Sequence, residues 1–142
     1  MTAELLALAD KIEALDGPCR ETDVMIRCAV FAPVGSFVRQ SPINGAWCVY
    51  GPKARLWEPH GLSNMQTSGA FTGSIDAADS LVPKGWCRIM GDDPETPGCM
   101  ARLYRGGTLY DSQGCAPTLA LALSAAAIRA KATTPPASED KP

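Results

Sequence analysis

The stretch that decides the fold is WCRIMGDDPETPGCMARLYR, residues 86–105. Its two ends, Trp86–Met90 and Cys99–Arg105, have the composition of β-strands. The segment Gly91–Gly98 between them is rich in Gly, Pro and Asp, the residues that favour turns. The stretch therefore predicts a pair of strands joined by a turn, and the rest of the chain is interpreted outward from this pair.

Two amphipathic helices are expected near the start of the chain. The first helix carries an apolar stripe at three- and four-residue steps: Leu5, Leu8, Ile12 and Leu15. Gly17-Pro18 ends it, because glycine accepts the left-handed conformation and proline cannot continue a helix. A second helix is predicted from Arg20 to Ala32, before Pro33. So short a link indicates a helical hairpin.

The segment 34–69 lacks the helical periodicity of the preceding residues and is rich in turn residues. Three short pieces have β-propensity and are separated by turn residues: Ser36–Arg39, Ala46–Tyr50 and Arg55–Trp57. Residues 61–69 are polar and glycine-flanked, so we expect a surface loop there. The path of the whole segment is left open.

Two more helices flank the central strand pair. Ser74 is a good N-cap for a short helix that Pro83 ends. A small strand is expected at Thr108–Tyr110. A final alanine-rich helix opens with Pro117 at its first position and runs to Ala132.

This order predicts an α+β fold, in which an antiparallel sheet is sandwiched between helices in the order α-α-β-β-α-β-β-α. We expect residues 1–132 to form a single α/β/α sandwich domain. The tail, residues 133–142, has no apolar residue larger than alanine or proline, so we expect it to be disordered.

Composition narrows the class of function. The 142 residues are 46% hydrophobic and 20% charged, which are globular values. A net charge of −2 with well-mixed charges argues against a DNA or RNA partner, and no apolar run is long enough to span a membrane. The start of the chain lacks the pattern of a secretory signal. We expect a protein of the bacterial cytoplasm.

The cysteines and the histidine do not form a recognisable reactive centre. None of the six cysteines stands in a C-x-x-C pair, and the only histidine is His60, so we expect no metal and no cofactor. Several cysteines lie in apolar runs and are interpreted as reduced thiols buried in the core. No nucleophile elbow, P-loop or dinucleotide-binding pattern is present, so we expect no enzymatic activity.

Three segments together resemble the phage ABA sandwich family: LLALADKIE (5–13) followed by Gly-Pro (17–18) and Arg-Glu-x-Asp (20–23), FTGSIDAADSLVPKGW (71–86) and APTLALALSAAAIRA (116–130). The resemblance implies a small protein of a phage or prophage, with a sheet between helical layers. Members of the family are mostly uncharacterised. The family often has Thr where this chain has Ala116, so we expect the last helix to lack a side-chain cap.

Two groups of residues are candidates for ligand binding. Thr72 and Ser74 precede a helix start, where free backbone N–H groups can hold a phosphate or carboxylate, unless they serve only as caps. The other group places arginine beside aromatic residues: Arg55, Trp57, Trp86, Arg88, Arg102, Tyr104 and Arg105. Residues two apart on a strand share a face, which could stack a planar ring and clamp its phosphates, or could be an ordinary exposed sheet face.

Our leading hypothesis is a phage-encoded, non-enzymatic protein that binds an anionic, nucleotide-like small molecule. By sequestering a nucleotide-derived immune signal it would counter host defence. One alternative is a phage accessory or structural protein that acts through protein contacts, and another is a hydrolase of such nucleotides. We expect a homo-oligomer.

Overall fold

The computed structural model describes residues 2–57, 70–92, 98–105 and 111–133. Within them the helices are α1 (Thr2–Glu13), α2 (Arg20–Phe31), α4 (Ile75–Asp79) and α5 (Leu119–Thr133). The strands are β1 (Phe37–Gln40), β2 (Trp47–Tyr50), β3 (Trp86–Asp92), β4 (Cys99–Arg105) and β5 (Asp111–Ala116). The predicted α+β class and the predicted order of elements are confirmed.

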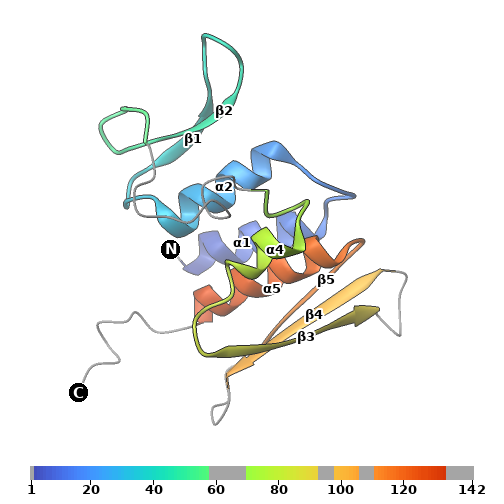
Figure 1. Cartoon of the computed structure of the whole chain (residues 1–142). Coiled ribbons are helices and arrows are strands. Elements are labelled where there is room, and N and C mark those ends of the chain that lie inside the picture. Colours follow the sequence, from blue (N-terminus) through green and yellow to red (C-terminus); the bar gives the residue numbers. More distant parts are fainter. Residues whose placement is uncertain (1, 58–69, 93–97, 106–110, 134–142) are drawn as a thin grey trace, which may run out of the picture.

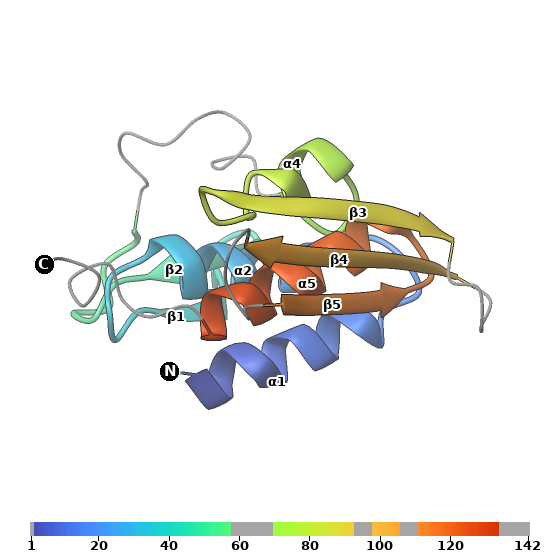
Figure 2. The same ribbon diagram turned by 90° about the horizontal axis from the view of Figure 1, so that it is seen from below.

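The strands form two antiparallel sheets that lie apart. The β1–β2 hairpin packs on α2, and the three-stranded sheet has the order β3-β4-β5 with β4 in the middle. Figure 1 shows the hairpin at one end of the molecule, the three-stranded sheet at the other, and the helices between them. In Figure 2 the helices lie behind one face of the three-stranded sheet, and the other face is turned to the viewer.

The core forms around α5, which is apolar on every side. All of its residues from Ala120 to Ile128 are buried, which is typical of a central helix rather than of a surface helix. α1 packs on one side of α5, and β4 and β5 pack on another. Ala101 and Leu103 of β4 point toward α5 and are fully buried, as is Ile12 of α1. The alanine-rich surface of α5 lets its neighbours approach closely.

The closest approach is between β5 and α5. A Cβ atom added to Gly114 would lie 2.1 Å from the carbonyl oxygen of Ala122 and 2.8 Å from the backbone nitrogen of Ala126. Next to it, the hydroxyl of Ser112 donates a hydrogen bond of 2.5 Å to the carbonyl oxygen of Ala126. The strand backbone therefore packs directly against the helix backbone, and only glycine, which has no Cβ atom, fits at this position without a steric clash.

The structure differs from the sequence-based expectations at the last strand, the last helix cap and the cysteines. The strand before the last helix is Asp111–Ala116; the expected strand at Thr108–Tyr110 lies outside the described residues. The last helix does not lack a side-chain cap, because Thr118 Oγ1 accepts a hydrogen bond from the Leu121 N–H at 3.2 Å. The six cysteines are free thiols, but none is fully buried, and Cys87 is exposed. The predicted tail lies largely outside the described residues.

The contact at Gly114 makes a testable prediction. Gly114→Ala should lower the free energy of unfolding by ~3 kcal/mol or more, since backbone atoms cannot move aside as a flexible side chain can. Gly91→Ala is the matched control, because Gly91 is also a strand glycine of the same sheet and has open space around its Cα. Urea unfolding compares the two variants. Equal stability of both would show that β5 does not rest on α5 in this way.

Candidate functional site

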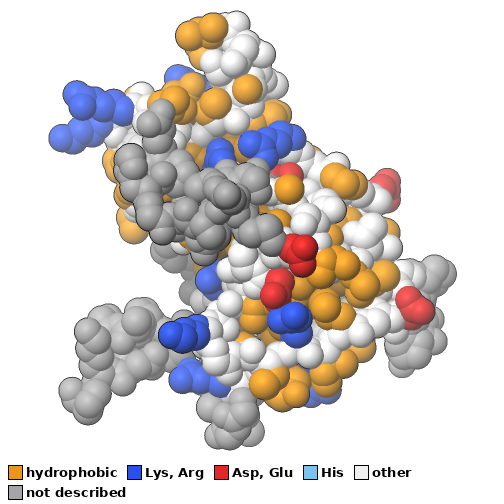
Figure 3. Space-filling view, in the orientation of Figure 1, with side chains coloured by type: hydrophobic (Ala, Val, Ile, Leu, Met, Phe, Trp, Pro, Cys, Tyr) orange, Lys and Arg blue, Asp and Glu red, His pale blue; other side chains and the backbone are white. Residues whose placement is uncertain are grey.

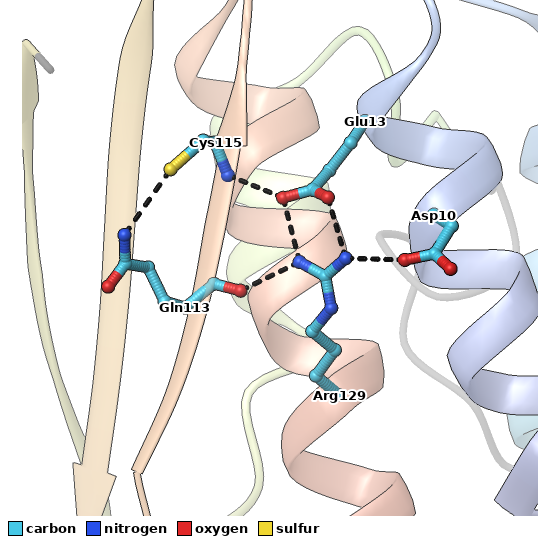
Figure 4. Close-up of polar contacts among 5 residues, drawn as sticks. All are labelled: Asp10, Glu13, Gln113, Cys115 and Arg129. Atoms are coloured by element: carbon cyan, nitrogen blue, oxygen red, sulfur yellow. Dashed lines mark hydrogen bonds and ion pairs between the residues drawn. The ribbon is translucent and has the colours of Figure 1, made fainter. Parts of the chain in front are cut away.

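The most connected polar cluster surrounds Arg129 and joins three elements (Figure 4). Its guanidinium donates to both carboxylate oxygens of Glu13 at 2.7 and 2.6 Å, to Asp10 at 2.7 Å and to the carbonyl oxygen of Gln113 at 2.8 Å. The Cys115 N–H donates to the same Glu13 carboxylate at 2.7 Å. Because these groups already satisfy one another, the cluster fastens α1 and β5 to α5 and offers little to a ligand.

The structure gives Thr72 and Ser74 local roles. Thr72 is 1% exposed, and its hydroxyl and N–H each donate to the Asp23 carboxylate at 2.7 Å. The Cys19 N–H donates to Thr72 Oγ1 at 2.8 Å. Ser74 caps α4 by accepting a hydrogen bond from the Ala77 N–H. These side chains tie the start of α4 to the start of α2, which favours the capping alternative. Anion binding by this segment stays a prediction.

The arginine and aromatic residues of β3 and β4 divide between the two faces of the sheet. In the register, Arg88 is opposite the buried Leu103, whereas Arg102 is opposite the exposed Ile89. Directly opposite residues share a face, so Trp86, Arg88 and Arg105 are on the helix side and Arg102 and Tyr104 are on the outer side. The expectation that residues two apart share a face is confirmed, but the two pairs do not form one site.

The guanidinium groups of Arg88 and Arg102 are also engaged with carboxylates. Arg88 pairs with Asp79 of α4 at 2.5 Å, and Arg102 makes a two-pronged contact with Asp111 at 2.6–3.2 Å. The Asp111 carboxylate raises the pKa of Arg102 through hydrogen bonds and charge. A phosphate would have to displace these carboxylates, so neither arginine is a ready-made anion site.

Arg55 and Trp57 belong to the other end of the molecule. The expected strand Arg55–Trp57 is reduced to an isolated bridge between Leu56 and Tyr50 of β2. The Trp57 N–H donates to the carbonyl oxygen of Val49, which keeps this segment beside the hairpin. These residues therefore do not join those of β3 and β4 (Figure 1).

A cavity of about 420 Å³ lies between α1, α2 and the β1–β2 hairpin. α2 and its C-cap, Ala32, contribute a stripe at helical spacing: Glu21, Met25, Cys28, Ala29 and Ala32. Glu4 and Leu8 of α1, the turn 33–36, and Val38 and Trp47 of the hairpin complete the described lining. Val34 is 81% exposed, so the cavity opens to solvent. Sequence reasoning missed this site, although the stripe on α2 was visible as a repeat of small and apolar residues.

The polar groups of the cavity are few. Glu4 and Glu21 lie in the first turns of α1 and α2. Ser36 Oγ is buried and has no hydrogen-bond partner among the described residues. Burial raises the pKa of the Cys28 thiol, so Cys28 is a neutral, weakly reactive group at pH 7. An apolar recess with a few polar atoms is the usual form of a small-molecule site.

Comparison with family models, with curated proteins and with solved structures finds no match to this chain. The resemblance to the phage ABA sandwich family stays a prediction. None of the described helices combines the length and apolarity needed to span a lipid bilayer. Among the described residues no His, Cys, Asp and Glu side chains gather in threes or more to hold a metal ion, and His60 lies outside them.

The interpretation of the Arg129 cluster as structural predicts a stability effect. Arg129→Met should lower the free energy of unfolding by ~2 kcal/mol, because it leaves the Glu13 carboxylate partly buried without its main partner. Arg102→Met is the matched control, since its ion pair is exposed to solvent and should contribute little. Urea unfolding at pH 7 measures both. A larger loss for Arg102→Met would contradict the assignment.

The same comparison has a defined pH dependence. Burial acts to raise the pKa of Glu13, but hydrogen bonds from Arg129 and Cys115 outweigh it and hold the pKa below 4.5. A carboxyl with a lowered folded pKa stabilises above the unfolded pKa and loses this effect as the pH falls through the folded one. The gap between wild type and Arg129→Met should therefore narrow below pH 4.5. Burial raises the pKa of Asp23, so the contribution of Asp23 to the free energy of unfolding changes with pH in the opposite direction. That contribution is the same in wild type and in Arg129→Met, so it cancels when the two proteins are compared.

Proposed function

We propose that this chain is a binding protein for a small molecule and that the cavity between α1, α2 and the hairpin is its site. The observation that carries the proposal is the cavity itself: about 420 Å³, open to solvent and mostly apolar. Volumes of ~300–1,000 Å³ with a few polar groups are characteristic of ligand sites. The consecutive elements α1, α2, β1 and β2 build it, with lining residues between Glu4 and Trp47.

Binding without turnover fits the chemistry of the lining. The thiol and the hydroxyl in the described lining that could act as nucleophiles are those of Cys28 and Ser36. The raised pKa of the Cys28 thiol disfavours the reactive thiolate. Ser36 Oγ has no described partner that could take its proton. A third possibility, a nucleotide hydrolase, therefore finds no support in this cavity.

The nature of the ligand differs from the sequence hypothesis. The described lining contains no Lys, Arg or His, whereas a nucleotide-derived signal needs cationic or N–H-rich contacts for its phosphates. Sequestration of an immune signal on behalf of a phage is supported by the resemblance of the sequence, and not by this geometry. The ligand that the cavity favours is a mostly apolar molecule.

Contacts with another protein are the second candidate, because apolar side chains are exposed away from the cavity. Ile89 and Tyr104 on the outer face of the three-stranded sheet are 53% and 37% exposed, and Ile43 at the tip of the hairpin is 93% exposed. Figure 3 shows hydrophobic side chains on the surface at both ends of the molecule. Such patches favour association, and light scattering would show whether the chain forms a homo-oligomer.

Filling the cavity tests the main proposal. Ala29→Phe should weaken binding of the neutral apolar fluorophore N-phenyl-1-naphthylamine by about tenfold or more, because the new ring occupies the recess. Ala7→Phe is the control, since Ala7 is an exposed helical alanine outside the lining. Fluorescence titration gives the affinities, and urea unfolding verifies that both variants fold.

Two results would contradict the proposal. The first is an absence of fluorophore binding to the wild-type protein, and the second is equal binding by wild type and Ala29→Phe. Calorimetry with cyclic dinucleotides belongs in the same experiment. Saturable heat from a cyclic dinucleotide that Ala29→Phe leaves unchanged would place the functional site elsewhere and favour the nucleotide hypothesis.

A further inference from the structure

We infer that the ligand of this cavity is an organic cation: an apolar body that carries a positively charged, ammonium-like group. The inference rests on the proposed function and adds the chemical class of the ligand. It is based on the charges that line the cavity, on the aromatic ring beside them, and on an unsatisfied polar atom in the wall.

The charges in the described lining are all negative. Glu4 and Glu21 are its ionisable carboxylates, and neither forms an ion pair with another described residue. Elsewhere in the described chain, Asp10, Asp79 and Asp111 are neutralised by arginine. Unneutralised carboxylates beside an apolar recess give it a negative potential, which attracts cations and repels anions.

The basic residues of α2, Arg20 and Arg27, do not belong to the described lining of the cavity, although Arg27 interacts electrostatically with Cys48 of β2. The lining stripe of α2 recurs every three or four residues, so it occupies one side of the helix. Arg20 and Arg27 are more than about 100° around the helix from the centre of that stripe, by the spacing of 3.6 residues per turn. The helix therefore presents carboxylate and apolar groups to the cavity and its guanidinium groups to another side.

The two carboxylates lie toward opposite ends of the cavity. α1 and α2 run in opposite directions (Figures 1 and 2), and each carboxylate belongs to the first turn of its helix. The stripe on α2 extends from Glu21 to Ala32, a rise of ~16 Å along the axis. A ligand can thus place its apolar body along Met25 and Cys28 while a cationic end meets a carboxylate.

Trp47 and Ser36 add contacts that suit the same ligand. Trp47 pairs with Gln40 across the hairpin and lines the cavity on the same face as Val38. The face of an indole ring attracts an ammonium group within about 6 Å. Ser36 Oγ, buried and without a described partner, has lone pairs that can accept an ammonium N–H. An anion would gain from neither the ring face nor the carboxylates.

A matched series of ligands tests the inference by calorimetry: n-octylammonium, 1-octanol and octanoate at neutral pH. These share one apolar chain and differ in the charge at its end. We expect n-octylammonium to bind about fivefold tighter than 1-octanol, and octanoate to bind weakest. In the double variant Glu4→Gln, Glu21→Gln, the preference for n-octylammonium over 1-octanol, measured on that same variant, should fall to within about twofold.

The control variant is Asp16→Asn, Asp92→Asn, which removes the same charge from exposed positions outside the cavity. It should keep the full preference for ammonium. If 1-octanol binds and Ala29→Phe abolishes its binding, yet n-octylammonium binds no tighter, the inference is wrong and the proposed function stands. If none of the three ligands binds the wild-type protein, both the inference and the proposed function are wrong.

Discussion

The structure depends on the direct contact between the backbone of β5 and the backbone of α5. Gly114 makes this contact possible, since any Cβ there would overlap the carbonyl oxygen of Ala122. Once β5 lies on α5, its ladder with β4 sets the position of the three-stranded sheet, and Arg129 fastens α1 to the same corner. α5 thus holds α1, and α1 and α2 together with the hairpin line the cavity.

The sequence predicted the elements whose signals are local. Apolar periodicity identified α1 and α2, and turn residues separated β3 from β4. β5 was missed because its sequence, DSQGCA, is poor in β-branched and aromatic residues. β5 is a strand because of tertiary contacts. Its Gly114 and Ser112 approach α5 closely, and it pairs with the neighbouring strand β4. The cap of α5 is local: Thr118, rather than residue 116, precedes the first helical residue Leu119 and accepts a hydrogen bond from the Leu121 N–H.

The candidate site shows a further limit of reasoning from sequence. Alternation along one strand placed Trp86 with Arg88 and Arg102 with Tyr104, but only the register between β3 and β4 reveals that the two pairs face opposite ways. The cavity depends on the packing of three segments, so no single motif encodes it. Its one local signal was the stripe of α2 from Glu21 to Ala32, a helix face that needed a partner.

The central claim is that a small molecule occupies the cavity beside Trp47, and nuclear magnetic resonance tests it most directly. A titration of the ¹⁵N-labelled protein with n-octylammonium should shift the indole N–H of Trp47 and the amides of Cys28 and Ser36 in a saturable way. The resonances of β3 to β5 should remain in place. Shifts confined to the three-stranded sheet, or no saturable shift near Trp47, would contradict the account.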